Sequence, residues 1–297
     1  MSGWSTSDIP DQSGRTVVVT GANSGLGAET AKALAAAGAQ VILACRNTQK
    51  ADVVAREIGS AATVAQLDLA DLDSVRTFAD GLTGADVLIN NAGVMAIPHK
   101  RTAQGFEMQI GTNHLGHFVL TALVLDKITD RVVTLSSSMH QIGRIDLGDL
   151  NWETRRYRRW RAYGDSKMAN LMFGKELADR LAAAGSTTTS VIAHPGYAAT
   201  ELQGRSETVE DVIMNLANKV VAQSAAAGAL PTLYAATSPD ATNGTFYGPT
   251  QMFGSRGAPG VSGYNKRADN TAIRDGLWAV SEKLTDTTFA VGPGSTT

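Results

Sequence analysis

Short apolar runs alternate with longer stretches of helical composition from residue 16 to about residue 194. The first run, TVVVT at 16–20, is β-branched and almost uninterrupted in its apolar character, which is typical of a parallel strand buried on both faces. An alanine-rich stretch follows over 28–37 and stops at Gly38, as a helix often does. The alternation predicts an α/β fold in which helices cover both faces of a parallel sheet.

The same pattern locates the individual elements in one domain. Glycines such as Gly38 and Gly185 stand where predicted helices return to strands. Because no repeat interrupts the series, we expect a single doubly wound domain over 14–289, with loose segments at 1–13 and 290–297. The predicted strands are 16–20, 40–44, 63–67, 86–90, 131–136, 188–193 and one near 245–248, and the predicted helices lie near 25–37, 48–58, 71–81, 105–128, 161–184 and 223–237.

The composition of the 297-residue chain narrows the class of partner. With 43% apolar residues the chain can bury a large core, and its net charge of -2 gives no overall attraction to nucleic acid or anionic membrane, so we expect a small-molecule substrate. Cys45 is the only cysteine, which excludes an internal disulfide. Residues 1–13 lack the apolar stretch of a signal peptide, and no window is long and apolar enough to span a membrane, so we expect a cytoplasmic protein.

Candidate chemistry collects directly after the strands. The first strand runs into TGANSGLG at 20–27, a glycine-rich turn before a helix, where bare N–H groups and a helix N-terminus can hold a pyrophosphate. Its G-x-x-x-G-x-G spacing differs from the commonest dinucleotide fingerprint. In an open parallel sheet a ligand binds beyond the carboxyl ends of the strands. Polar or glycine-bearing residues follow five further strands there, as ACRN at 44–47, LDL at 67–69, NNAG at 90–93, SSS at 136–138 and HPG at 194–196.

Tyr163 and Lys167 have the spacing of a proton carrier and its helper. Residues four apart project from one face of a helix, so the lysine ammonium can sit beside the phenol and favour its ionised form. That would make the tyrosine an acid and base usable near neutral pH. The spacing alone also arises by chance on amphipathic helices. Together with the glycine turn, it favours hydride chemistry on a nicotinamide.

This set of motifs resembles the short-chain dehydrogenase/reductase family over residues 14 to 200. Within that family, LACR at 43–46, NHLGHF at 113–118 and YGDSKMAN at 163–170 are most similar to the retinol-dehydrogenase and protochlorophyllide-reductase-like branch. The resemblance implies a Rossmann-type sheet of about seven strands and an NAD(P)-dependent oxidoreductase acting on CH-OH donors. The motifs that carry it are the turn at 20–27, Asp68-Leu69, NNAG at 90–93, Asn113, the serine run, Tyr163, Lys167, and Pro195-Gly196 followed by Thr200.

The resemblance also implies a role for each catalytic residue. Tyr163 would exchange a proton with the substrate oxygen, while Lys167 lowers its pKa and bonds the nicotinamide ribose hydroxyls. Ser137 would donate a hydrogen bond to the developing alkoxide, with Ser138 as the alternative in the run of three serines. Asn113 would hold a water that links Lys167 to solvent. Tyr163 follows Ser137 by 26 residues, and the inserted segment must loop out near the substrate mouth.

Cofactor preference depends on the end of the second strand. An acidic residue there suits the ribose of NAD, whereas an arginine suits the 2′-phosphate of NADP. The chain has Cys45-Arg46, so NADP is expected rather than NAD, with Asn23 as a second contact; otherwise Arg46 is only a solvated loop residue. The implied cofactor contacts are Gly21, Asn23, Ser24, Gly25, Leu26, Gly27, Arg46, Asp68, Leu69, Asn91, Ala92, Gly93, Tyr163, Lys167, Pro195, Gly196 and Thr200.

Other segments have less decisive patterns. Residues 201–223, where the family carries a substrate lid, have an apolar face at helical spacing; this fits fixed core equally well, and as a lid it would close a lipophilic pocket. The basic and aromatic stretch at 155–161 favours a rim near the cofactor phosphates or a subunit contact over nucleic-acid binding. Surplus apolar residues on the helices near 105–128 and 161–184 predict a homodimer or homotetramer. The histidines lack metal-ligand spacing, so no metal site is expected.

The leading hypothesis is an NADP-dependent oxidoreductase that interconverts a carbonyl and an alcohol on a small lipophilic substrate, with Tyr163 as acid and base. The alternative is a non-catalytic NADP-binding redox sensor or scaffold of the same fold, and such proteins usually lose the tyrosine or the lysine. A sugar-nucleotide epimerase or dehydratase uses the same pair. Those enzymes generally have a T-G-x-x-G-x-x-G turn and a larger C-terminal substrate domain, neither of which is found in this sequence.

Overall fold

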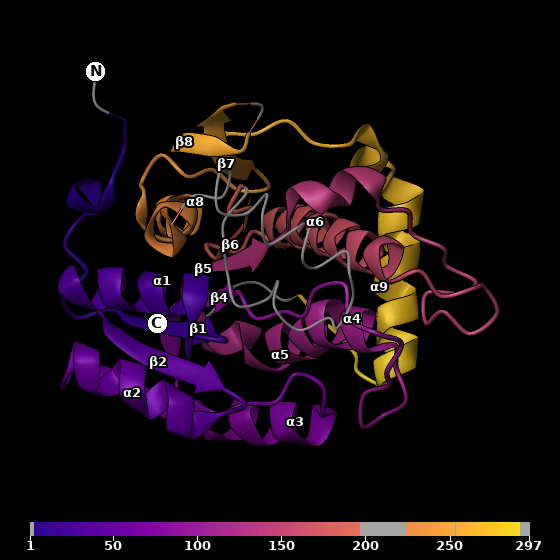
Figure 1. The fold of residues 1–297 in the computed structure, drawn as a ribbon, viewed down its shortest axis with the longest axis horizontal. Coiled ribbons are helices and arrows are strands. Elements are labelled where there is room, and N and C mark those ends of the chain that lie inside the picture. Colours follow the sequence, from indigo (N-terminus) through magenta and orange to yellow (C-terminus); the bar gives the residue numbers. More distant parts are fainter. Residues whose placement is uncertain (1–2, 197–223, 253, 292–297) are drawn as a thin grey trace.

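The computed structural model describes residues 3–196, 224–252 and 254–291. Within them one sheet has eight strands in the order β3-β2-β1-β4-β5-β6-β7-β8, in which β1 to β7 are parallel and β8 runs antiparallel to β7 (Figure 1). The strand order reverses between β1 and β4, which makes the sheet doubly wound. The strands are β1 (Thr16–Thr20), β2 (Gln40–Cys45), β3 (Ala62–Gln66), β4 (Ala85–Asn90), β5 (Ile128–Leu135), β6 (Thr189–Ala193), β7 (Phe246–Gln251) and β8 (Arg256–Val261).

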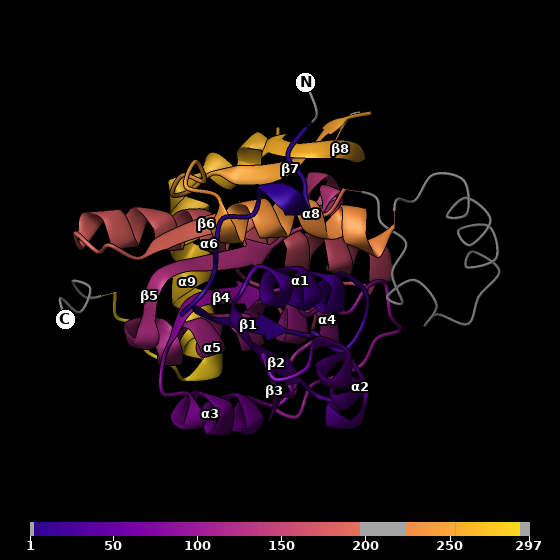
Figure 2. The ribbon, with the colours of Figure 1, turned by 90° about the vertical axis from the view of Figure 1, so that its left-hand side faces the viewer.

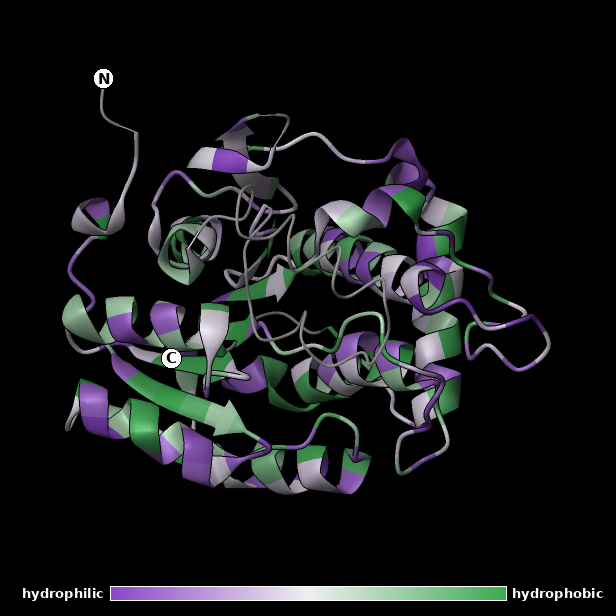
Figure 3. Cartoon of the chain, viewed as in Figure 1, coloured by the Kyte–Doolittle hydropathy of each residue, from purple (hydrophilic) through white to green (hydrophobic). Residues whose placement is uncertain are grey.

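Helices cover both faces of the sheet. One face carries α1 (Gly25–Ala36), α2 (Thr48–Ile58) and α8 (Ala225–Thr237); the other carries α3 (Leu72–Gly81), α4 (Met108–Ile110), α5 (Gly116–Val124) and α6 (Arg159–Ala183), with α9 (Thr271–Thr285) packed against α6 (Figures 1 and 2). Strand side chains of alternating direction fill both layers, and the predominantly hydrophobic colouring of β2 in Figure 3 illustrates this double burial. A π-helical turn (Gly111–Leu115) joins α4 to α5, and 3-10 turns lie at η1 (Thr6–Asp8), η3 (Leu125–Lys127), η4 (Ser138–Ile142) and η6 (Lys266–Asp269).

The predicted fold class is confirmed, and two elements beyond the prediction complete it. β8 contains Pro259 and two glycines, which disfavour a strand in the sequence, but an edge strand tolerates proline because no second ladder needs its N–H. α9 begins after Asn270, whose side chain accepts a hydrogen bond from the Ile273 N–H, so its start signal is present in the sequence. The helix predicted over 105–128 is instead divided into α4, the π turn, α5 and η3.

α9 covers apolar residues of α5 and α6 within the same chain. The ring centroid of Phe118 lies 5.2 Å from that of Trp278 and 5.2 Å from that of Phe289. The ring of Phe173 lies 5.9 Å from Trp278, and all four rings are buried. The apolar surplus on the two helices therefore meets an element of its own chain. It no longer supports a homo-oligomer, which remains a prediction.

Residues 3–13, which we expect to be loose, make defined contacts with the domain. Trp4 meets Tyr234 of α8 edge to face, with ring centroids 5.3 Å apart. Gln12 is buried and its side-chain oxygen accepts a hydrogen bond from Arg15. The described part of this segment is thus held against α8 and the start of β1.

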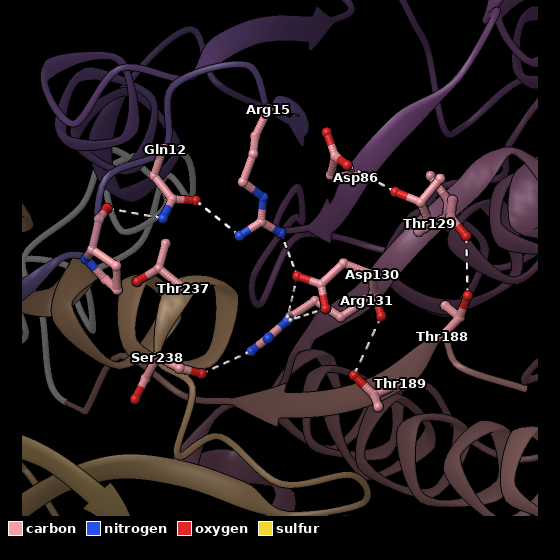
Figure 4. A network of polar contacts seen from close by, with 12 residues as sticks. Gln12, Arg15, Asp86, Thr129, Asp130, Arg131, Thr188, Thr189, Thr237 and Ser238 are labelled. Atoms are coloured by element: carbon pink, nitrogen blue, oxygen red, sulfur yellow. Dashed lines mark hydrogen bonds and ion pairs between the residues drawn. The ribbon is translucent and has the colours of Figure 1, made fainter.

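A polar network joins the amino ends of several strands, away from the predicted site (Figure 4). Asp130 of β5 binds Arg15, next to β1, and Arg131, its own neighbour in sequence. Arg131 also donates to the carbonyl oxygen of Ser238, at 3.1 Å, just after α8. Asp86 of β4 accepts from the backbone of β1 and from a threonine of β5. This end of the sheet is structural, which leaves the carboxyl ends of the strands for a ligand.

Trp278→Ala should lower the free energy of unfolding by about 3–5 kcal/mol, because it removes the ring through which α9 packs on α5 and α6. Val261→Ala is the control, since Val261 is 74% exposed and should change stability by less than about 0.5 kcal/mol. Urea unfolding of the three proteins measures both values. A Trp278→Ala cost as small as that of the control would contradict the role given to α9.

Candidate active site

A pocket of about 250 Å³ lies at the carboxyl ends of β1 to β4. It is formed by the glycine turn, the loops after β2 and β3, and the segment after β4, where an open parallel sheet binds its ligand. Twelve of the predicted cofactor residues line it, namely Gly21, Asn23, Ser24, Gly25, Leu26, Gly27, Arg46, Asp68, Leu69, Asn91, Ala92 and Gly93.

The glycine turn requires its glycines. Gly21 and Gly25 have φ of +68° and +54°, which favour glycine over residues with a Cβ. A Cβ at Gly27 would lie 2.5 Å from the carbonyl oxygen of Gly21 and 2.6 Å from the side-chain nitrogen of Asn91, so that position must also stay bare. The turn leads into the N-terminus of α1, whose N–H groups and dipole favour an anion. The residues present therefore fit a dinucleotide pyrophosphate.

The hydroxyl of Thr20 holds three parts of the site together. It accepts hydrogen bonds from the backbone N–H groups of Asn91 and Ala92, both at 2.9 Å. It also contacts Nε2 of His117, at 2.9 Å. The other ring nitrogen of His117 contacts the carbonyl oxygen of Asn113, at 3.0 Å. Because a carbonyl oxygen only accepts, His117 carries its proton on Nδ1, and the Thr20 hydroxyl donates to Nε2.

Asn113 lies in the π-helical turn and is fully buried. Its side chain accepts from the Val94 N–H at 2.7 Å and donates to the Val94 carbonyl oxygen at 2.9 Å and to Ser166 at 2.9 Å. A Cβ at Gly93 would lie 3.0 Å from Asn113 Oδ1 and 3.6 Å from Lys167 Nζ, so both residues border the same glycine. The water that Asn113 is expected to hold stays a prediction.

Tyr163 lies in the first half of α6 and is buried beside the serine run. Its phenol lies close enough to the Ser137 hydroxyl for that group to influence its pKa. Burial raises the pKa of Tyr163 to about 12, and the Ser137 hydroxyl opposes that rise. At neutral pH the phenol is therefore protonated and ready to act as an acid.

Burial is the largest influence on the pKa of Tyr163, and the lowering by Lys167 that the resemblance implies stays a prediction. The ammonium group of Lys167 lies 5.9 Å from the centroid of the Tyr163 ring and donates to the carbonyl oxygen of Leu135 at 3.2 Å. Burial lowers the pKa of Lys167 itself to about 8. Desolvation thus dominates both groups, and the two side chains are near neighbours without a direct hydrogen bond among the contacts of the described residues.

The three serines at 136–138 differ in burial and in the groups that they contact. Ser136 is buried and donates to the carbonyl oxygen of Lys167 at 2.7 Å. Ser137 contacts Tyr163, whereas Ser138 is exposed at the start of η4. Of the two alternatives left open by the sequence, Ser137 is the one placed beside the phenol.

The remaining predicted contacts lie beyond the pocket. Pro195 and Gly196 follow β6 at the same edge of the sheet, and Gly196 has a φ of +69°. Its N–H donates to Nδ1 of His194 at 3.2 Å. Thr200 and the candidate lid at 201–223 lie outside the described residues.

Sequence reasoning missed one cation and several neutral residues of the pocket. Lys50 lines it together with Arg46, because Asn47 caps α2 by accepting from the Lys50 N–H and so sets the first turn of the helix beside the strand end. An N-cap asparagine directly after Arg46 is the signal that could have located it. The other lining residues beyond the prediction are Ala44, Asn47, Leu67, Val94 and Thr112.

The inserted segment before α6 is tied to that helix. Arg155 of this segment binds one oxygen of buried Asp165 at 3.2 Å, and Arg161, which lies within α6 itself, binds the other at 3.0 Å. Tyr157 donates to buried Glu107 at 3.0 Å, and desolvation raises the pKa of that carboxyl group. Arg155 and Arg161 of the basic stretch at 155–161 therefore pair with a carboxylate inside the protein, so their positive charges need no nucleic acid to explain them.

Two classes of feature are absent from the described residues. No three histidine, cysteine or acidic side chains come together there as a metal site. No helix in the described ranges is both long and apolar enough to cross a bilayer.

The family model for short chain dehydrogenase matches residues 15–211. Human retinol dehydrogenase 13 is 48% identical over 202 residues, which cover 64% of this chain and 60% of the relative. Human retinol dehydrogenase 11 is 49% identical over 211 residues, covering 67% and 64%, and mouse retinol dehydrogenase 14 is 40% identical over 263 residues, covering 79% and 78%. The matches to the two human proteins thus span less than two thirds of their length.

Two solved structures share the fold to different extents. The crystal structure of an uncharacterised protein from Mycobacterium paratuberculosis has a TM-score of 0.86 and 50% identity, and the match covers 97% of this chain and 100% of that one. A short chain dehydrogenase from Burkholderia cenocepacia in complex with NADP has a TM-score of 0.62 at 24% identity, covering 80% and 96%. The second likeness concerns the fold alone.

His117 should be protonated on Nδ1 at neutral pH and should titrate near pH 4, because burial lowers its pKa to about that value. The unfolded chain takes up this proton first, so the stability contributed by neutral His117 is complete above about pH 6.5 and is lost as the pH falls toward 4. Long-range ¹H–¹⁵N NMR of the imidazole measures both tautomer and pKa. An Nε2-protonated ring, or titration near pH 6.5, would show that His117 does not join Thr20 to Asn113.

Proposed function

The chain belongs to the short-chain dehydrogenase/reductase family, and from this premise we propose that it is an NADP-dependent oxidoreductase that interconverts a carbonyl and an alcohol. The observation that carries this proposal is the buried Tyr163 phenol, which lies beside Ser137 and Lys167 at the carboxyl edge of the sheet. The candidate acid Tyr163, the hydrogen-bond donor Ser137 and the glycine turn that fits a pyrophosphate all follow the carboxyl ends of the strands.

In carbonyl reduction each residue of the site has a separate role. NADPH, when bound, supplies the hydride that the carbonyl carbon accepts. The carbonyl oxygen gains its proton from the Tyr163 hydroxyl, which is the protonated form present at neutral pH. The Ser137 hydroxyl donates a hydrogen bond to the same oxygen as negative charge develops on it. Lys167, with a pKa near 8, is largely cationic at neutral pH and stabilises the tyrosinate left behind. Alcohol oxidation uses the same groups in reverse.

The preference for NADP rests on the charge around the pocket. Arg46 and Lys50 both line it near the end of β2, and the strand itself ends in Cys45 where an NAD enzyme would present an acid. Asp68 also lines the pocket, but it follows β3 rather than β2, and its Oδ1 accepts from the Ala70 N–H at 2.9 Å. Two cations suit a 2′-phosphate better than a neutral hydroxyl.

The proposed substrate is a lipophilic aldehyde, ketone or alcohol. The relatives are named retinol dehydrogenases, whose named substrate is of this class. Ile142 is 43% exposed, and a Cβ at Gly164, the residue after Tyr163, would lie 2.8 Å from its side chain. The exposed apolar side chain of Ile142 thus packs against the residue that follows Tyr163 in α6. The cytoplasmic location and the homo-oligomer remain predictions from the sequence.

Tyr163→Phe should reduce kcat by about 10²–10⁴-fold while the dissociation constant of NADPH stays unchanged, because the ring is kept and only the proton carrier is lost. Tyr234→Phe is the matched control. Tyr234 lies on α8, packs against Trp4 and does not line the pocket, so this variant should keep normal kcat. Steady-state assays with a panel of aldehydes and ketones, together with fluorescence titration of NADPH, provide both readouts. Normal turnover by Tyr163→Phe would remove Tyr163 from the mechanism, and NADPH binding with no turnover by the wild type would favour the non-catalytic alternative.

Arg46→Ala and Lys50→Ala should each weaken NADPH binding by roughly tenfold or more, which corresponds to about 1.5–3 kcal/mol for a charge-assisted contact. NADH binding should change little, because NADH has no 2′-phosphate. Arg56→Ala is the control, since Arg56 lies in the last turn of the same α2 helix and does not line the pocket. Fluorescence titrations with both nucleotides separate the effects. Equal losses for NADPH and NADH would refute the assignment of the 2′-phosphate.

A further inference from the structure

Two buried histidines lie behind the proposed reaction centre, and the mechanism uses neither of them. His140 belongs to η4, three residues after Ser137, and His194 directly precedes Pro195-Gly196. Phe246 of β7 lies between them, with its ring 4.9 Å from His194 in a stacked contact and 5.4 Å from His140 edge to face. Both imidazoles are at most 3% exposed.

His140 holds the backbone of Ser137. Its Nδ1 lies 2.6 Å from the Ser137 carbonyl oxygen, which also accepts from the His140 N–H at 3.0 Å. The backbone N–H of Asn265 donates to Nε2 at 3.2 Å. Because the carbonyl oxygen can only accept and the Asn265 N–H can only donate, His140 is the Nδ1-protonated tautomer. A chain of hydrogen bonds thus runs from Asn265 through the imidazole to Ser137, whose hydroxyl meets Tyr163.

His194 holds the Pro-Gly turn in the opposite tautomer. Its Nδ1 accepts from the Gly196 N–H, so Nε2 carries the proton and donates to the Ser262 hydroxyl at 2.9 Å. A Cβ at Gly248 of β7 would lie 1.9 Å from Nε2, so a glycine is needed there for the imidazole to reach Ser262. The geometry of β7 is therefore adapted to this contact.

Both histidines receive their outer partner from one short stretch, residues 262–265, which follows β8. This stretch is anchored on either side, since the Ser262 N–H donates to the Phe246 carbonyl oxygen at 2.8 Å and the Asn265 side chain donates to the Gln141 carbonyl oxygen at 2.9 Å. It lies outside the residues that the family model matches, 15–211.

We propose that residues 262–265 act as a brace that positions Ser137 through His140 and the Pro195-Gly196 turn through His194. The inference rests on the proposed function, because Ser137 matters only where a carbonyl oxygen is stabilised. The histidines are positioning residues, since their ring nitrogens are used by protein groups and leave none for a substrate. A serine displaced by an ångström stabilises the transition state poorly, whereas the pocket at the glycine turn is unaffected.

The backbone N–H of Asn265 can be removed by a conservative change. Asn265 has a φ of -69°, the value that proline imposes, so Asn265→Pro removes the donor at the required φ. Asn265→Ala is the matched control, because both variants lose the side-chain contacts and only proline loses the N–H. We expect kcat of Asn265→Pro to fall about tenfold below that of Asn265→Ala, with equal dissociation constants for NADPH. Equal kcat in the two variants would overturn the brace.

A second pair of variants covers the case in which Asn265→Pro does not fold. The amide nitrogen of His140→Asn can occupy the place of Nδ1 and still donate to Ser137, whereas His140→Leu cannot. The shorter asparagine does not reach the Asn265 N–H, so this pair tests only the contact of residue 140 with Ser137, and His140→Asn should keep several times more kcat than His140→Leu at unchanged NADPH affinity. Equal losses in kcat would show that the imidazole contributes only packing.

An NMR measurement separates the brace from the proposed function. In the wild type, His140 should be protonated on Nδ1 and His194 on Nε2, and the His140 Nε2 resonance should lose its hydrogen-bond shift in Asn265→Pro but keep it in Asn265→Ala. This readout needs no substrate, so it decides on the brace even where no carbonyl is turned over. An Nε2-protonated His140 would overturn the brace while leaving Tyr163 chemistry untouched.

Discussion

The hydroxyl of Thr20, at the carboxyl end of β1, is the contact on which the arrangement of the site depends. It binds the backbone after β4 through Asn91 and Ala92, and the π-helical turn through His117. One buried oxygen thereby sets the distance between the glycine turn, the segment after β4 and the turn that carries Asn113. A buried polar hub of this kind specifies geometry because each unsatisfied partner would cost about 1–3 kcal/mol.

Most of the fold and the pocket could be predicted because both follow from local chemistry. Apolar β-branched runs mark strands that are buried on two faces, and polar residues directly after such runs must gather at one edge of a parallel sheet. For that reason the glycine turn, Arg46, Asp68 and Asn91 all line one pocket. Ser137 could be named from the sequence, but its preference over Ser138 needed the fold, because only the backbone path of η4 decides which hydroxyl meets Tyr163.

The features that escaped prediction depend on contacts between distant segments. The apolar surplus of α5 and α6 looked like a subunit contact, yet Trp278 and Phe289, more than a hundred residues away, cover it. The pKa of Tyr163 is raised because burial outweighs the lowering effect of Ser137, and burial is a property of the folded state. The His140 and His194 contacts likewise need residues 262–265, which carry no motif.

We propose that the dinucleotide lies along one edge of the sheet, from the cations after β2 to the phenol on α6. A crystal structure of the protein with NADP tests that claim most directly. We predict the pyrophosphate on the turn at 20–27, the 2′-phosphate within hydrogen-bond distance of Arg46 and Lys50, and the nicotinamide beside Tyr163 and Ser137. A 2′-phosphate that contacts neither cation, or a nicotinamide ring turned away from Tyr163, would contradict it.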